Sequence, residues 1–429
     1  MKMRKQLTRI WMSVLCALLA LPAFASAAEL QFDSDTLVRG FERDTVSESD
    51  ALVLPAYEYL KLDLGELSGA GLSFHLYGWG RWDVTDNDYF EDQTAGEILY
   101  AYLDYSREEA NFKARFGRQY IFEGVANEAV DGLRLSSDLG PYFQASAYVG
   151  QPVSLDSTDG RDGDITYGGR LAHHLTSWYD LGVSYKLIEN DDNTAEEFVG
   201  GDLGLYLPGN VIVSGYSSYN LETEGWGEHS YSVRFNLAGL NIRPFFERYV
   251  YEDYFGTGVN SANPFRFLAG TDEELTVVGG DLTYASIENW NFAAKVKSYD
   301  YDVRDDSSQY YAVLATWHQE DLPELGGEAG FMDGDSAETK YTLLRAYTYW
   351  DKLPGSLPLA FLSGDVVWVK YDQDIFNEDT SLFISLGAGQ QFLEKALEVK
   401  LSGDYSSDPF FDNDLRGLLT ISYHYGRTL

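Results

Sequence analysis

Residues with the chemistry of an enzyme active site are scarce in this sequence. None of the six histidines has the spacing of a metal site or of a serine–histidine pair: His75, His173, His174, His229, His318 and His424. The single cysteine is Cys16, and no C-x-x-C-H motif for haem attachment is present. We therefore expect a protein that is not an enzyme and that holds no cofactor within its own chain.

Two acidic stretches offer oxygen atoms to a cation. DSTDGRDGD (156–164) and MDGDSAE (332–338) carry closely spaced carboxylates, which are the ligands that Ca²⁺ prefers. Neither stretch follows the spacing of an EF-hand loop, so solvated surface loops are the favoured interpretation. The weak calcium candidates are Asp156, Asp159, Asp162 and Asp164.

The most distinctive basic stretch is GRQYIFEGVANEAVDGLRL (117–135). Two interpretations are open for it. Either Arg115, Arg118 and Arg134 line a constriction, or contacts between arginine and Asp131 tie two strands of a hairpin together. Arg118 shares its alternation parity with apolar neighbours, so it needs a β-bulge or a position near an interface to reach water.

Most of the chain alternates between apolar and polar residues with a period of two, which is typical of strands with two unlike faces. Short connections such as LPGN (207–210) take turns with longer acidic ones such as TDNDYFEDQTAG (85–96). This rhythm predicts an all-β, up-and-down antiparallel transmembrane barrel of about 22 strands (about 20 to 24) without a plug domain. The expected strands are 30–43, 51–65, 71–85, 95–107, 110–122, 128–138, 140–150, 164–174, 177–188, 197–207, 209–221, 226–237, 240–252, 274–286, 289–303, 308–318, 323–333, 337–351, 357–372, 380–391, 394–406 and 413–428.

A soluble β-sandwich or propeller would alternate in the same way. The length and number of the strands favour a membrane barrel, and so do the aromatic residues near strand ends, because only a lipid-facing surface needs aromatic girdles. Residues that fit such girdles are Trp79, Trp82, Tyr100, Tyr102, Trp290, Tyr347, Tyr349, Trp350, Tyr423 and Tyr425.

In such a barrel the polar parity faces the lumen. The lumen-facing candidates are Arg81, Lys113, Arg115, Arg134, Arg170, Arg234, Lys295, Lys297, Glu398 and Lys400. A water-filled interior tolerates charges of both signs, so parity alone marks none of them as a binding site.

The N-terminus has the pattern of a secretory signal peptide. A basic start is followed by an apolar run (11–24) too short to span a bilayer, and then by Ala25-Ser26-Ala27. We expect residues 1–27 to be removed and 28–429 to form one barrel domain. The remaining 27 basic and 68 acidic residues argue against nucleic acid as a partner, and a content of 45% hydrophobic residues argues against disorder.

The final residues, LLTISYHYGRTL (418–429), set an apolar and aromatic face against a small polar one. This ending resembles that of Gram-negative outer-membrane β-barrels, although Leu429 replaces the usual terminal Phe and Arg427 interrupts the aromatic row. The GRQ…DGLRL pair is similar to strand pairs of porin-like and polysaccharide-export barrels. The resemblance implies the cell outer membrane, contacts with its lipid and lipopolysaccharide, and recognition of the last strand by the barrel-assembly machinery.

A barrel of this kind is expected to act as a passive porin-like channel for ions or small hydrophilic solutes. Its acidic mouths would give a mild cation preference. The longest loop, 253–273, is the expected constriction, with Asp253, Asn260, Asn263 and Arg266 as candidate residues.

Other functions stay open. The layout is also similar to the barrel of porin–cytochrome conduits, which implies a multihaem cytochrome in the lumen and electron transfer. Export of a charged polysaccharide is a third hypothesis. An outer-membrane protease or phospholipase is the enzymatic alternative, since barrel enzymes spread few catalytic residues over non-contiguous strands.

Overall fold

The structure is a computed structural model and describes residues 29–44, 49–67, 71–85, 88–107, 111–153, 164–190, 193–255, 272–351, 353 and 359–428. Its strands are β1 Glu29–Arg43, β2 Ala51–Val53, β3 Pro55–Leu67, β4 Leu72–Asp83, β5 Thr94–Arg107, β6 Phe112–Glu123, β7 Ala126–Leu139, β8 Phe143–Pro152, β9 Asp164–Leu175, β10 Tyr179–Asn190, β11 Asn193–Leu207, β12 Val211–Asn220, β13 Gly225–Leu237, β14 Leu240–Val250, β15 Glu274–Ile287, β16 Trp290–Tyr301, β17 Asp306–Trp317, β18 Glu324–Gly334, β19 Tyr341–Trp350, β20 Phe361–Ile375, β21 Glu378–Phe392, β22 Leu397–Asp408 and β23 Phe411–Thr428. The helical pieces are α2 Tyr251–Phe255, η4 Ala337–Thr339 and η5 Leu393–Lys395.

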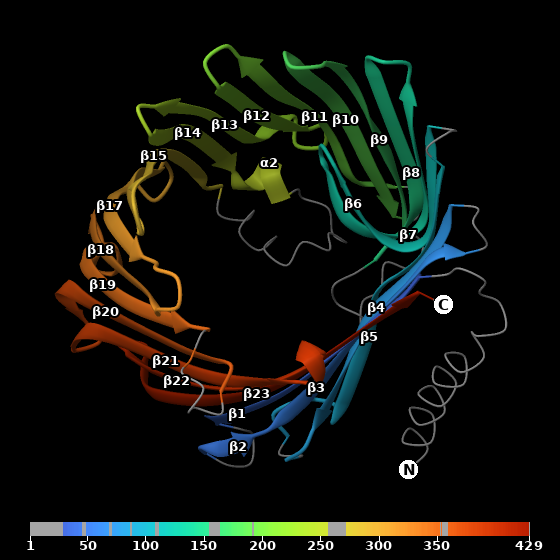
Figure 1. Cartoon of the computed structure of the whole chain (residues 1–429). Helices are drawn as coiled ribbons and strands as arrows, with labels where there is room; N and C mark the ends of the chain where they lie inside the picture. Colours follow the sequence, from blue (N-terminus) through green and yellow to red (C-terminus); the bar gives the residue numbers. More distant parts are fainter. Residues whose placement is uncertain are drawn as a thin grey trace.

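The strands form one closed antiparallel barrel (Figure 1). β23 pairs with β1, with His424 opposite Asp33, and this pairing closes the ring. β2 and β3 are one strand interrupted at Leu54, so the barrel has the 22 strands that alternation predicts. Closure removes the sheet edge, whose unpaired backbone groups are costly in hydrocarbon.

The two faces of the wall differ as lipid and water require. Phe116 on β6 is 65% exposed, Leu386 on β21 62% and Leu401 on β22 63%, although all three are large and apolar. Their sequence neighbours Arg115 and Lys400 point to the opposite, lumenal side. An outward apolar face stable only in lipid identifies the wall as membrane-spanning. Among the described residues, no helix is long and apolar enough to cross a bilayer.

Strand positions agree with the predicted ranges to within four residues, and the differences lie at both ends of the barrel. The predicted strands 357–372 and 380–391 leave the acidic residues between them as a loop. Instead β20 and β21 continue to a turn at Phe376 and Asn377, which both have a positive φ, at 51° and 71°. Two consecutive left-handed residues make the tight hairpin turn that matches the twist of the strands.

The aromatic girdles are only partly as expected. Trp82, Trp290, Trp350, Tyr423 and Tyr425 share the outward apolar face. Trp79, Tyr100, Tyr102, Tyr347 and Tyr349 do not: alternation places them with lumenal residues such as Arg81, Asp104 and Arg345. The girdle assignment was wrong for these five, because aromatic residues near strand ends occur on both faces of the wall and only their parity tells the faces apart.

The hairpin of β6 and β7 bends into the lumen, and Figure 1 shows β6 inside the ring of strands. Pairing between β5 and β6 ends at Ala101 and Arg118, so the hairpin tip leaves the wall beyond that point. Gly117 lies at the divergence with a φ of 124°, where a side chain would collide with the carbonyl of Ala101. We call residues 119–130 the inner hairpin.

The inner hairpin is docked on the adjoining stretch of wall that begins at β8. The backbone N–H of Val125 donates to Ser184 Oγ on β10 at 3.0 Å, and Tyr148 on β8 donates to Glu128 at 2.9 Å. Ile121, Ala126 and Val130 pack with Tyr148 in a small buried cluster. The lumen therefore contains a packed element of the wall itself, and among the described residues there is no separate plug domain.

Candidate lumen site

A cavity of about 1020 Å³ lies beside the inner hairpin. Four cations and four carboxylates line it: Lys113, Arg115, Arg134, Arg170, Asp104, Glu123, Asp138 and Asp202. Lys113, Arg115 and Glu123 come from β6, and Arg134 comes from β7. Asp138 also comes from β7, whereas Asp104 lies on β5, Arg170 on β9 and Asp202 on β11. The bend in one hairpin therefore brings together residues far apart in the chain.

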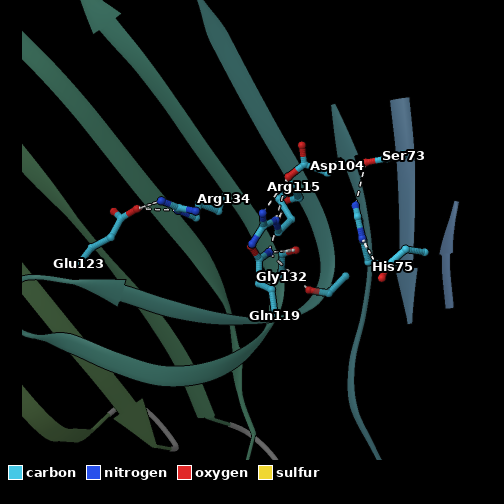
Figure 2. Close-up of polar contacts among 10 residues, drawn as sticks. Ser73, His75, Asp104, Arg115, Gln119, Glu123, Gly132 and Arg134 are labelled. Carbon is cyan, nitrogen blue, oxygen red and sulfur yellow. Dashed lines mark hydrogen bonds and ion pairs between the residues drawn. The ribbon is translucent and has the colours of Figure 1, made fainter. Parts of the chain in front are cut away.

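Most of these charges are paired. Arg115 Nε donates to Asp104 at 2.9 Å and Arg134 Nε donates to Glu123 at 2.5 Å, as Figure 2 shows. Arg170 bridges Asp202 at 2.6 Å and Asp180 at 3.2 Å. Paired charges on a wet wall supply donors and acceptors without a strong field of one sign, so the cavity suits polar solutes of low charge.

Lys113 differs from its neighbours at this cavity. It is exposed, and it has no hydrogen-bond or ion-pair partner among the described residues. A lone ammonium group in water is well solvated and free to meet a solute.

The other predicted lumen residues are scattered. Arg81 lies near the loop-rich rim, stacks over Phe90 at 3.7 Å and donates to the Asp92 carbonyl at 2.9 Å. Lys297 lies 5.6 Å from the Phe245 ring, and Glu398 accepts a hydrogen bond from Gln391 at 2.8 Å. The structure places Arg234, Lys295 and Lys400 on lumenal parity of β13, β16 and β22, away from the cavity lining.

The predicted constriction loop is described only at its two ends, 253–255 and 272–273. Asp253 belongs to α2, which packs against β12 and β13, and Asn220 donates to its carbonyl at 3.0 Å. Figure 1 shows α2 inside the ring of strands. Asn260, Asn263 and Arg266 lie outside the described residues.

Most of the calcium candidates also lie in parts of the chain that the structure does not describe. Asp156, Asp159 and Asp162 lie outside the described residues, and Asp164 is buried at the start of β9. No group of three or more His, Asp or Glu in the described part of the chain is arranged to hold a metal ion.

Arg118 has a structural contact. All three of its guanidinium nitrogens donate hydrogen bonds. Nε and Nη2 donate to the two carboxylate oxygens of Asp131, each at 2.8 Å. Nη1 donates to the carbonyl of Ile98 on β5 at 3.0 Å, at the place where β6 has left that strand. Arg118 therefore bridges the divergence between β5 and the inner hairpin.

Sequence reasoning missed an aromatic row on the lumenal faces of β3, β4 and β5. Its members are Trp79, Tyr57, Tyr59, Tyr77, Tyr100 and Tyr102, each half-buried. Successive ring centroids in that order lie 6.2, 6.4, 6.3, 5.5 and 5.5 Å apart. The signal was available, because each ring has the parity of a charged neighbour such as Lys61, Arg81 or Asp104.

Polar groups flank the Tyr102 end of the aromatic row, which is the end farther from the loop-rich rim. His75 lies 5.0 Å from Tyr102 and contacts Asp63 through Nδ1 at 2.5 Å and Ser73 through Nε2 at 2.9 Å. Lys61 pairs with Asp63 at 2.9 Å. Arg115 lies 4.2 Å above the Tyr102 ring, which connects the row to the cavity.

Comparisons with known proteins support the fold and little more. No family model matches the chain, and no curated protein matches it. Among solved structures, the translocation pore of the P pilus usher PapC aligns at a TM-score of 0.50 and 10% identity, covering 94% of this chain and 100% of that one. A BenF-like porin from Pseudomonas fluorescens aligns at 0.47 and 9%, covering 95% and 100%, and Acinetobacter baumannii OccAB2 at 0.46 and 11%, covering 94% and 99%.

At these identities the likeness concerns architecture alone. The chain has the closed β-barrel fold of porin-like outer-membrane proteins, and its apolar exterior belongs in the outer membrane.

Proposed function

We propose that this barrel is an outer-membrane channel for the passive passage of ions and small hydrophilic solutes, with a mild preference for cations. The observation that carries the proposal is the polar, charge-balanced cavity beside the inner hairpin. A barrel of about 22 strands is wide enough for an aqueous lumen, and a packed hairpin narrows it to solute size.

The rim supports the cation preference. Exposed carboxylates gather on the described loops of the loop-rich end, among them Glu91, Asp92, Asp272, Asp305 and Asp335. The whole chain has a formal charge of −37. An acidic mouth concentrates cations and repels anions, and the effect weakens as salt screens the charges.

The inner hairpin also bears on the alternative of a barrel that sheathes a cytochrome. A folded partner needs an open lumen, whereas the hairpin is docked on β8 to β11 and occupies part of that space. This favours solute passage over sheathing. The balanced cavity likewise favours neutral or weakly charged solutes over a polyanionic polysaccharide.

Planar bilayer recording of the refolded chain tests the proposal. We expect steady single-channel openings, a reversal potential on the cation side under a salt gradient, and loss of that selectivity at high salt. Channels that stay silent after verified refolding would contradict a passive pore, and an anion-side reversal potential would contradict the cation preference alone.

A further inference from the structure

We propose that the aromatic row binds the sugar rings of neutral oligosaccharides and guides them from the rim to the cavity. The proposal rests on the channel function above and names its substrate class. The row was defined by Trp79, Tyr57, Tyr59, Tyr77, Tyr100 and Tyr102.

The position of the row rules out lipid anchoring as its purpose. Tyr59 and Tyr77 are followed or preceded by aliphatic residues that point outward, Leu60 and Leu76. Tyr57, Tyr59 and Tyr77 share their face with Lys61 and His75. Tyr59 stacks against Tyr77 at 6.3 Å with an interplanar angle of 27°. Half-buried aromatic rings on a wet wall leave apolar surface exposed to water, and a ligand that covers this surface is stabilised by the hydrophobic effect.

The path of the row is continuous. On β4 the register sets Trp79 opposite Tyr59, and on the other side Tyr77 lies opposite Tyr100. Strand order and direction then carry the row from the loop-rich rim to Tyr102, where Arg115 and the cavity begin. No gap between successive rings exceeds 6.4 Å, so an extended ligand can contact several rings at once.

Chemistry of the flanking groups selects the ligand. A pyranose ring has an apolar face of C–H groups, which suits an aromatic face, and a rim of hydroxyl groups, which suits polar side chains. Lys61 with Asp63, and Arg115 with Asp104, offer donors and acceptors whose charges are already compensated. A strongly charged ligand would gain no net opposite charge here, whereas a neutral sugar can use each of these groups.

A chain of sugars is favoured over a monosaccharide. Each contact between one sugar and one aromatic ring is weak, so a single sugar would bind too briefly to be retained. Linked rings that occupy neighbouring contacts bind with a raised effective concentration. Residence time in the channel should therefore rise with the number of linked sugars.

Single-channel block by maltohexaose, compared with maltotriose and with tetraethylammonium, tests the proposal. We expect resolved, concentration-dependent blocks by maltohexaose that last longer than those by maltotriose. Tyr77→Ala and Tyr100→Ala should each shorten the block by about tenfold, which corresponds to about 1.4 kcal/mol. Tyr77→Phe keeps the ring and should keep most of the residence time.

Trp368→Ala is the matched control, because Trp368 is an aromatic residue on the outward face of β20 and should leave both the conductance and the sugar block unchanged. Open channels that maltohexaose does not block would overturn the proposal while leaving the channel function intact. The proposal would also be overturned if the duration of maltohexaose block were unchanged in both alanine variants, or if only tetraethylammonium blocked the channel. Absence of any openings would instead reject the underlying function.

Discussion

At the scale of single residues, Arg118 shows how a charge is used inside a membrane wall. Its parity is that of Phe116, yet it is not stranded in lipid, because Asp131 and the Ile98 carbonyl satisfy the guanidinium. The backbone of β5 loses its partner where the inner hairpin departs, and a free carbonyl in an apolar environment is costly. Arg118 replaces part of that lost pairing.

We predict that Arg118→Ala lowers the free energy of unfolding by about 1–3 kcal/mol, the usual range for a hydrogen-bonded charge whose partner is left behind. Arg345→Ala is the comparison: its pair with Asp365 (3.0 Å) joins two strands that are paired along their length, so about 0–1 kcal/mol is expected. Urea titration in micelles, followed by tryptophan fluorescence, measures both. Equal losses would mean that Arg118 has no special role at the divergence.

At the scale of elements, the inner hairpin decides the shape of the lumen. Gly124 allows a tight turn with a φ of 59°, and the adjoining Val125 reaches β10 and β11. A Cβ added to Gly200 on β11 would lie 2.5 Å from Val125 Cγ1. The two positions are thus close enough for a cross-link, although 75 residues separate them in the chain.

We predict that the pair Val125→Cys and Gly200→Cys forms a disulfide on mild oxidation, because the side chains would meet at bonding distance. Cys16, in the predicted signal peptide, is the only natural cysteine, so no other disulfide competes. Non-reducing gels and conductance before and after reduction supply the measurement.

The control pair is Val125→Cys with Gly417→Cys, since an added Cβ at Gly417 would have no neighbour within 4 Å. It should stay reduced. If the first pair fails to cross-link, the inner hairpin is not docked as described. If cross-linking abolishes the conductance, the docked hairpin closes the channel.

At the scale of the whole molecule, the distribution of apolar and polar residues is the reverse of that in a soluble protein, because the apolar side chains lie on the outside. Neighbouring residues of one strand meet different solvents: Leu401 is 63% exposed on the outer face, whereas Ser402 has the lumenal parity. The same substitution at the two sites should therefore have opposite consequences.

We predict that Leu401→Arg destabilises the folded barrel by about 2–4 kcal/mol if the residue lies near the bilayer midplane, while Ser402→Arg has little effect because its charge enters water. Refolding into lipid vesicles, followed by heat-modifiable gel mobility and urea unfolding, compares them. Equal tolerance of the two arginines would contradict the assignment of the outer face.

The sequence alone determined the strand number, the positions of the strands and the closure of β23 on β1, because alternation is a local property that a membrane wall imposes on every strand. It also determined which side chains have the lumenal parity, Lys113 and Arg134 among them. Only the tertiary structure decided that the hairpin at Gly117 leaves the wall and that Arg115 and Arg170 share one cavity with it. Those facts depend on strand tilt, on the register between distant strands and on docking of Val125 at Ser184, none of which leaves a period in the sequence. The aromatic row depends on both sequence and tertiary structure. The parity of each ring in the sequence turns it toward the lumen, but only the stagger of β3, β4 and β5 joins the six rings into a continuous path.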